Sequence, residues 1–153
     1  MNEVCEKAQE FLDTIFNSVG LDLHTGIEET GGCLLKIDGA DSSLLLNESG
    51  ELLEALQHLV NQMFGRTLPK GERIVCDVQN FRSTREAELR AMARHAAERV
   101  RSTGVDFTFG PMLSNERRVI HLALAGEDDL STESVGEGSA RRLKVSLKAS
   151  PRN

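Results

Sequence analysis

Residues 115–124 read Asn-Glu-Arg-Arg-Val-Ile-His-Leu-Ala-Leu, and the assignment of the fold depends on this stretch. Its apolar residues recur at helical spacing, which predicts a short helix over 116–125. Arg117 and His121 are four positions apart, so about 40° separates them around the helix axis and both lie on one edge. A guanidinium donates hydrogen bonds in a plane that suits phosphate, and an imidazole adds a donor or a stacking ring. If both side chains are exposed, the pair forms a phosphate-binding site; in the alternative, which the residues by themselves favour, Arg117 pairs with a carboxylate and His121 is half-buried.

The segments around this helix predict a small module of helices and strands. Ser83 and Glu86 have the spacing of a capping box, which marks the start of a helix. Alternating apolar residues in the rest of the segment indicate strands. The predicted elements are a helix over 84–101, a strand over 105–109, the helix over 116–125 and two strands within 130–147, in the order αβαββ.

The first half of the chain predicts a second module. Apolar residues at i, i+4 and i+7 indicate amphipathic helices, and Gly31-Gly32 tolerates the positive φ of a tight reversal between two strands. The predicted elements are a helix over 3–19, strands over 21–24 and 33–37, a short stretch at 44–46, a helix over 51–64 and a strand over 74–78. Their order is αββ(α)αβ.

Residues 83–145 together resemble the R-3-H domain, which is named for an Arg-x-x-x-His signature. The likeness rests on the stretch quoted above, on the arginine-rich helix around 91–100, and on Thr-Glu-Ser-Val-Gly-Glu-Gly at 132–138. Residues 3–78 have the element order of a type II KH domain, and Leu-Glu-Ala-Leu-Gln-His-Leu-Val-Asn at 53–61 resembles the helix after its nucleic-acid loop. This domain order is that of the bacterial Jag family, so the chain resembles a Jag protein without the family's N-terminal extension.

The resemblance implies an α+β fold of two domains. These are a KH type II-like αββααβ domain at 1–80 and an R-3-H αβαββ domain at 81–149, followed by a frayed tail at 150–153. The resemblance also implies a noncatalytic protein that binds RNA or single-stranded nucleic acid, mainly through phosphate contacts of the R-3-H domain. The residues expected at the contact surface are Arg117, Arg118, His121, Arg141, Arg142 and Lys144.

The loop that clamps nucleic acid in a KH domain is degenerate in this chain. That loop normally reads Gly-x-x-Gly with a basic residue inside, because backbone amides and a cation approach the phosphates closely. The corresponding residues are Asn47, Glu48, Ser49 and Gly50, so Glu48 places a negative charge where a cation is expected. We expect this domain to bind RNA weakly or not at all. In the alternative, Asn47 adopts a positive φ and Ser49 donates a hydrogen bond.

Charge is divided unequally along the chain. Residues 1–81 carry 5 Lys and Arg against 14 Asp and Glu, a net charge of −9, whereas residues 82–153 carry 13 against 10, a net charge of +3; the total is −6. Only the second half has the positive charge to gain much binding free energy by neutralising phosphates. The acidic half is expected to keep the protein soluble. In a second hypothesis, the protein is an adaptor. Its acidic half then docks a small KH-only protein or a cell-envelope regulator, as the Jag resemblance implies.

The remaining polar residues predict no metal, cofactor or catalytic site. The histidines other than His121 lack the spacing of a metal cluster, and the acidic residues at 127–129 are typical of a solvated turn. The glycines at 136 and 138 lack the third glycine of a dinucleotide loop. An enzyme with His121 as general base lacks a second acid, a nucleophile or a metal in motif form.

Cysteine usage and hydropathy indicate a cytoplasmic protein. Cys5, Cys33 and Cys76 are odd in number and widely spaced, which predicts reduced, buried thiols. The longest aliphatic run, at 44–46, is far shorter than the roughly 20 residues that cross a bilayer. The N-terminus lacks the basic start and apolar stretch of a secretory signal. We therefore expect no membrane span and a cytoplasmic location.

Overall fold

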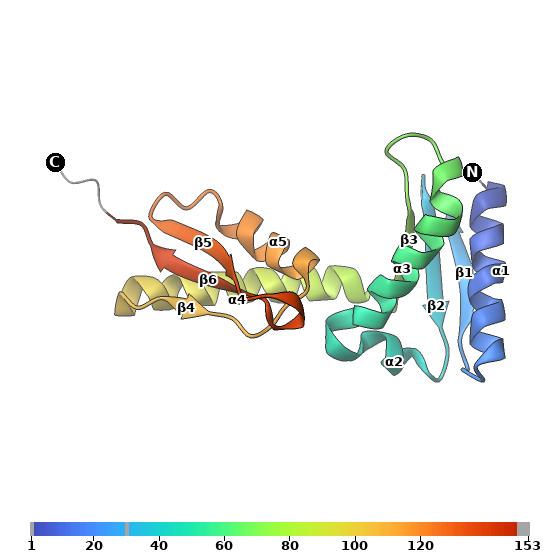
Figure 1. The fold of residues 1–153 in the computed structure, drawn as a ribbon, viewed down its shortest axis with the longest axis horizontal. Helices are drawn as coiled ribbons and strands as arrows, with labels where there is room; N and C mark the ends of the chain where they lie inside the picture. The colour runs from blue at the N-terminus through green and yellow to red at the C-terminus, as the bar shows by residue number, and fades with distance from the viewer. Residues whose placement is uncertain (1, 30, 150–153) are drawn as a thin grey trace. The chain divides into compact units, whose positions relative to one another are not determined.

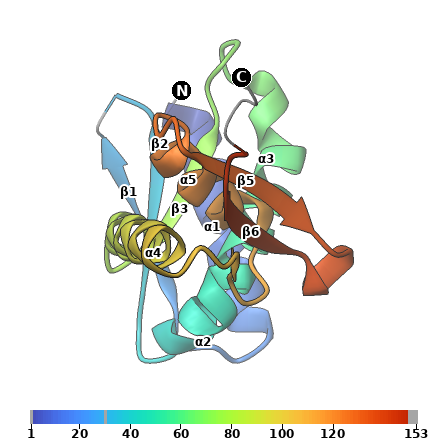
Figure 2. The same cartoon turned by 90° about the vertical axis from the view of Figure 1, so that its left-hand side faces the viewer.

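The structure is a computed structural model that describes residues 2–29 and 31–149. The chain divides between Arg82 and Ser83 into two compact units, here called the N-terminal unit and the C-terminal unit. Figure 1 labels their helices and strands, and Figure 2 shows the same ribbon from another side. Each unit has its own hydrophobic core, as separate domains do. The tail at 150–153, which the sequence predicts to be frayed, lies outside the described residues.

The N-terminal unit has the order αββααβ, as the sequence predicts. Its elements are α1 (Asn2–Ser18), β1 (His24–Glu29), β2 (Cys33–Asp38), α2 (Ser42–Leu46), α3 (Glu51–Phe64) and β3 (Ile74–Val78), with 3-10 turns at Asn47–Gly50 and Gly65–Thr67. The strand order is β1-β2-β3, in which β1 and β2 are antiparallel and β2 and β3 are parallel. Because parallel neighbours require a crossover, α2 and α3 form the connection from β2 to β3.

The core of this unit lies between the sheet and the helices α1 and α3. Buried and half-buried residues alternate along β2, so that Cys33, Leu35 and Ile37 share one face. Leu12 of α1 and Val60 of α3 are fully buried in the same cluster. The apolar spacing that predicts the two helices therefore also identifies the faces that they bury.

The first strand begins later than the sequence predicts. Alternation at 21–24 predicts a strand there, but β1 starts at His24. The backbone N–H of Leu21 donates to the carbonyl of Phe16 at 2.9 Å, at the end of α1, and the N–H of Asp22 donates to the carboxylate of Asp41 at 2.7 Å. These bonds terminate the helix and fix the loop, so the two N–H groups are not used for strand pairing.

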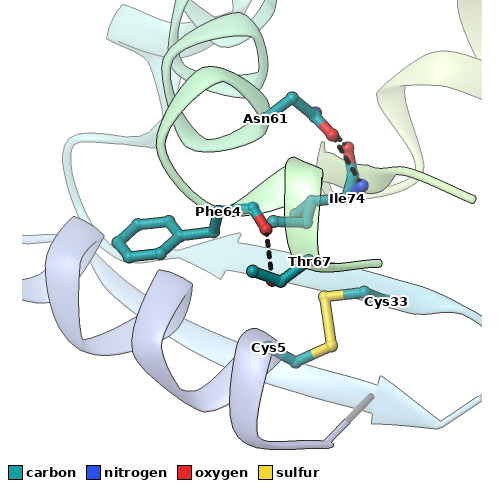
Figure 3. The surroundings of a disulfide bond; sticks show 6 residues. All are labelled: Cys5, Cys33, Asn61, Phe64, Thr67 and Ile74. Atoms are coloured by element: carbon teal, nitrogen blue, oxygen red, sulfur yellow. Dashed lines mark hydrogen bonds between the residues drawn. A yellow bond between two sulfur atoms is a disulfide. The ribbon is translucent and has the colours of Figure 1, made fainter. Parts of the chain in front are cut away.

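Cys5 and Cys33 form a disulfide bond, so the prediction of three reduced thiols was wrong. Figure 3 shows the bond between α1 and the first residue of β2. The two Cα atoms are 5.7 Å apart although 28 positions separate the residues in the sequence. Packing of α1 on the β1–β2 hairpin brings them together, and the sequence spacing does not reveal that contact. Cys76 is a free, buried thiol.

The C-terminal unit has the order αβαββ, as the sequence predicts. Its elements are α4 (Phe81–Thr103, which enters the unit at Ser83), β4 (Phe107–Thr108), α5 (Ser114–Leu124), β5 (Leu130–Val135) and β6 (Arg142–Leu147), with a 3-10 turn at Gly138–Ala140. The antiparallel sheet has the order β4-β6-β5. Val100 of α4, Ile120 of α5 and Val145 of β6 are fully buried in one cluster, so both helices cover the same face of the sheet.

Two predicted boundaries differ in this unit. α4 starts at Phe81, so Ser83 lies within its first turn and is not the N-cap residue. The residues before it, Gln79 and Asn80, have φ values of 50° and 58°, and this left-handed turn leads the chain from β3 directly into the helix. The strand predicted over 105–109 is only two residues long.

Two whole-chain properties bear on function. Over residues 2–29 and 31–149, no helix combines the length and apolar character that a membrane span requires. Within the same ranges no three histidine, cysteine or acidic side chains are grouped closely enough to hold a metal ion.

Candidate nucleic-acid interface

An ion pair between the half-buried Arg85 and the buried Glu116 fixes α5 to α4. Nε of Arg85 donates to Oε1 of Glu116 at 2.7 Å, and Glu116 is only 3% exposed. The hydrogen bond with Glu116 raises the pKa of Arg85 above its usual range. Glu116, Ile120 and Leu124 are the buried residues of α5 and recur every four positions. This buried edge determines which residues of α5 remain accessible, and Arg117 and His121 are among them.

Arg117 is oriented by the backbone just before α5. Its Nη1 donates to the carbonyl of Met112 at 2.6 Å, and the residue is half-buried. Among the described residues it forms no ion pair, so the alternative in which a carboxylate occupies the guanidinium does not apply. The other N–H groups of the guanidinium are available to a ligand.

His121 lies one turn further along the same helix edge. Its Nδ1 is hydrogen-bonded to Oγ1 of Thr132 on β5, and the residue is exposed rather than half-buried. The two ring nitrogens of an imidazole lie on different sides of the ring, so the bond to Thr132 leaves Nε2 directed elsewhere. The signature pair is therefore held at two points, by a loop carbonyl and by a strand hydroxyl.

Arg117, Arg118 and His121 line one pocket of about 540 Å³. The pocket is completed by residues from the start of α5 and from two strands, namely Ser114, Asn115, Thr132, Ser134 and Leu143. None of the described residues in this lining carries a carboxylate. Arg118 is exposed and makes no hydrogen bond or ion pair within the described part of the chain. A lining of guanidinium, imidazole and hydroxyl groups suits an anion.

The cations of β6 lie on the other face of the sheet. Leu143 and Val145 are buried under the helices, and Arg142 and Lys144 alternate with them. Thr132 pairs with Val145 across the two strands, which places Thr132 on the helix side with the pocket. The sheet therefore separates Arg142 and Lys144 from the signature pair.

The surroundings of these cations differ from those of the pocket. Nζ of Lys144 lies 3.7 Å from Oε2 of Glu133 and 4.0 Å from Oδ2 of Asp106. Arg142 is half-buried, and Arg141 is exposed in the turn before β6. Of the six groups expected at one surface, three share the pocket, two lie on the opposite face of the sheet, and Arg141 lies in the turn before β6.

The loop at 47–50, which the sequence predicts to correspond to the KH loop, has a second carboxylate beside it. Glu48, Ser49 and Gly50 all have left-handed backbones, with φ values of 51°, 60° and 79°. Asn47 has a φ of −62°, so the alternative in which it takes a positive φ is wrong. A hydrogen bond with Glu48 raises the pKa of Glu51, the first residue of α3. Two acidic side chains thus stand beside the loop, and both oppose a phosphate.

Comparison with known proteins assigns the chain to a family. Residues 87–147 match the R-3-H domain, and every residue that lines the pocket falls within this range. The RNA-binding protein KhpB of Clostridium symbiosum is 31% identical over 146 residues, which are 94% of this chain and 66% of that protein. The chain belongs to the KhpB family. KhpB-type proteins are also called Jag, so the family resemblance seen in the sequence is confirmed.

Other members of the KhpB family differ in length from this chain. RNA-binding protein KhpB of Bacillus subtilis is 29% identical over 146 residues, 94% of this chain and 70% of that protein. RNA-binding protein KhpB of Lactiplantibacillus plantarum is 31% identical over 114 residues, 74% of this chain and 35% of that protein. The chain spans about two thirds of the first two KhpB relatives and about a third of the last.

Sequence reasoning found the KhpB signature pair but missed the groups that hold it. Thr132 belongs to the stretch at 132–138 that carries the family resemblance. The sequence therefore marks the segment that contains Thr132, but it does not show that this side chain contacts His121. The carbonyl of Met112 is a backbone group and has no signature in the sequence. The Arg85–Glu116 pair joins residues 31 positions apart, and only the packing of α5 on α4 reveals it.

Proposed function

We propose that this chain binds single-stranded RNA without catalysing a reaction, and that the pocket at Arg117 and His121 is the main contact. The observation that carries the proposal is the lining of this pocket by two guanidinium groups and an imidazole from one helix. Curated relatives named as RNA-binding proteins support RNA as the ligand, and single-stranded DNA is the other nucleic acid to test. A single strand presents the phosphates and unstacked bases that such a pocket can admit.

The chemistry of the pocket suits the backbone of the nucleic acid better than its bases. Arg117 and Arg118 supply planar forks of donors for phosphate oxygens, and Met112 already orients the first of them. Nε2 of His121 adds a donor, or the ring provides a face for stacking. No aromatic side chain other than this imidazole is among the described lining residues, so we expect only slight sequence preference.

The cations near β6 enter the proposal as flanking contacts. Arg141, Arg142 and Lys144 lie outside the pocket lining, and Lys144 is close to two carboxylates. They would touch phosphates farther along the same strand, beyond the nucleotide in the pocket. Their contribution to affinity is expected to be smaller than that of Arg117 and His121.

A binding titration with fluorescently labelled single-stranded RNA tests the assignment. The double variant Arg117→Ala/His121→Ala is expected to bind at least about tenfold more weakly at low salt, because charge-assisted hydrogen bonds are lost. The matched control is Arg142→Ala/Lys144→Ala, which also removes two basic side chains but from the opposite face of the same sheet. Equal losses in the two double variants would show that only net charge matters and that the pocket is not the site.

A second titration tests the loop at 47–50. Replacement of the carboxylate in Glu48→Lys is expected to strengthen binding, because it removes the repulsion of phosphate at the start of α3. The control is Glu72→Lys, which makes the same charge change at an exposed site after α3. If substitutions at 47–50 alone abolished wild-type binding, the site would move to the N-terminal unit.

A second candidate function is docking of a protein partner by the acidic N-terminal unit. Its support is an edge of α3 where Leu52, Leu59 and Met63 are 43%, 40% and 51% exposed. These residues are spaced at i, i+7 and i+11 and lie on one side of the helix. The expected partner is a small KH-only protein or a cell-envelope regulator. A purified KH-only protein should co-elute with wild type but not with Leu59→Lys, whereas RNA binding should be the same for both.

We propose a noncatalytic role and a cytoplasmic location because the proposed ligand is RNA. The names of the curated relatives describe binding, and RNA is a cytoplasmic ligand in bacteria. The argument from reduced thiols no longer contributes, since Cys5 and Cys33 are bonded. Labelled RNA incubated with the protein should remain intact; turnover that disappears in His121→Ala would instead identify an enzyme.

A further inference from the structure

Thr132 is the described residue whose side chain is hydrogen-bonded to the imidazole of His121. Its Oγ1 contacts Nδ1 of the ring, and Thr132 also lines the pocket. Ser134 lines the same pocket two positions along β5, where alternation places it on the same face of the sheet. Thr132 is thus placed to control how the imidazole of His121 is presented.

The position of Thr132 makes its hydroxyl a fixed support. The residue lies within β5 and is paired with the fully buried Val145 of β6, so its backbone is held by the sheet. A β-branched side chain has few χ1 rotamers, and Thr132 is half-buried beneath the ring. His121 is exposed and near the end of α5, where without this bond its ring would turn freely.

The hydrogen bond between Thr132 and Nδ1 is compatible with a hydrogen on Nε2 in both charge states of His121. When the imidazole is neutral, the donor and the acceptor of this bond depend on the tautomer; in the tautomer that carries its hydrogen on Nε2, Thr132 donates to Nδ1. When the imidazole is protonated, Nδ1–H donates to Thr132, and Nε2 again carries a hydrogen. The charged groups that share the pocket with this ring are Arg117 and Arg118, both on α5, while β5 and β6 contribute only uncharged side chains to it.

We propose that Thr132 is a positioning residue that orients His121 so that Nε2–H is a hydrogen-bond donor to a phosphate of the bound nucleic acid. The inference rests on the proposed function, because it assigns a role within the same pocket. Thr132 acts through His121 and needs no contact with the ligand. The hydroxyl, and not merely the shape of the side chain, carries the effect.

Nitrogen resonances of the imidazole in the RNA-free protein test the hydrogen bond. In wild type and Thr132→Ser, Nε2 of His121 is expected to carry hydrogen, and Nδ1 to resonate away from the Nδ1 signals of the exposed His58 and His95. In Thr132→Val, which keeps the shape but lacks the hydroxyl, the Nδ1 signal should move to the position of those two histidines. An unmoved signal in Thr132→Val, in a protein with wild-type circular dichroism, overturns the proposal.

Titration with a fluorescein-labelled oligouridylate tests the consequence for binding. Thr132→Val is expected to bind about 3- to 10-fold more weakly than wild type, and Thr132→Ser within about twofold of it. Ser131→Ala, which removes a hydroxyl from the opposite face of β5, should bind as wild type does. Equal affinities of Thr132→Val and wild type overturn the positioning role. If wild type itself does not bind, the proposed function fails, while the nitrogen resonances still decide whether Thr132 orients His121.

Discussion

Single hydrogen bonds hold the side chains that matter most in the pocket. Arg117 is bonded to the carbonyl of Met112, and His121 to the hydroxyl of Thr132. Each bond comes from a different segment, so the two side chains are fixed before a ligand arrives. A ligand then loses less free energy to the ordering of these side chains.

The buried carboxylate of Glu116 allows a stability test at the level of one residue. Arg85→Ala would leave this carboxylate 3% exposed without its cation and should lower the free energy of unfolding by roughly 3–5 kcal/mol. The control is Arg90→Ala, which breaks an exposed ion pair with Glu86 on the same helix and should cost about 0–1 kcal/mol. Urea unfolding at neutral pH measures both, and equal costs would contradict a structural role for the buried pair.

Gly50 is a second residue whose substitution has a definite expected effect. Its φ is +79°, and a Cβ atom there would lie 2.6 Å from Cε1 of Phe81. Gly50→Ala should therefore destabilise the protein through both backbone strain and a clash. Gly71→Ala is the matched control, since Gly71 has a φ of +92° but no atom within 4 Å of the added Cβ. We expect Gly71→Ala to cost about 1 kcal/mol and Gly50→Ala roughly 1–3 kcal/mol more; the same loss of thermal stability in both would exclude the clash.

Among the elements, α1 is the one tied covalently to the sheet. Reduction of Cys5–Cys33 opens a loop of 28 positions and should lower the free energy of unfolding by roughly 3–4 kcal/mol in the chain-entropy account. Burial raises the pKa of Cys76 to about 12, which disfavours its reactive thiolate form at neutral pH. Urea unfolding with and without dithiothreitol measures the effect.

The control for this prediction is the double variant Cys5→Ser/Cys33→Ser. It lacks the disulfide in either medium, so dithiothreitol should not change its unfolding curve. A wild-type curve that is equally unaffected by the reductant would show that the bond does not contribute to stability.

Helices and strands with strong local patterns could be predicted from the sequence, and long-range contacts could not. The bounds of α3 and β3 agree with the prediction because apolar spacing and branched residues define them. The start of β1 was wrong because a bond to Phe16 at the end of α1 and a bond to Asp41, 19 positions from Asp22, use the preceding N–H groups. The start of α4 was wrong because left-handed residues at 79 and 80 outweigh a capping pattern.

The candidate site was predicted only in part, because local spacing can be read from the sequence and long-range packing cannot. Four-residue spacing along one helix shows that Arg117 and His121 share an edge, so the pair is readable from the sequence. Alternation in β6 shows that Lys144 faces away from Leu143 and Val145. Only the packing of α5 on the apolar side of the sheet shows that Lys144 is thereby separated from the signature pair.

For the whole molecule, the unequal division of charge predicts a moderate dependence of RNA binding on salt. Each phosphate contact on a single strand contributes a slope of about −0.7 to log K against log salt, so three to six contacts give about −2 to −4. Titrations at several salt concentrations measure this slope. Arg117→Ala should make it less negative by about 0.7, while the uncharged change Ser131→Ala should leave it unaltered. A wild-type slope near zero would contradict phosphate binding.

The edge position of β5 has a consequence for the length of RNA that the protein can recognise. In the order β4-β6-β5, this strand is the rim of the sheet, with Thr132 on one side and Glu133 beside Lys144 on the other. A nucleic-acid chain that reached both Arg117 and Lys144 would have to bend around that rim and pass the carboxylate of Glu133. Di- or trinucleotides would therefore sense the pocket alone, and only a longer, flexible strand would have a footprint covering both sides.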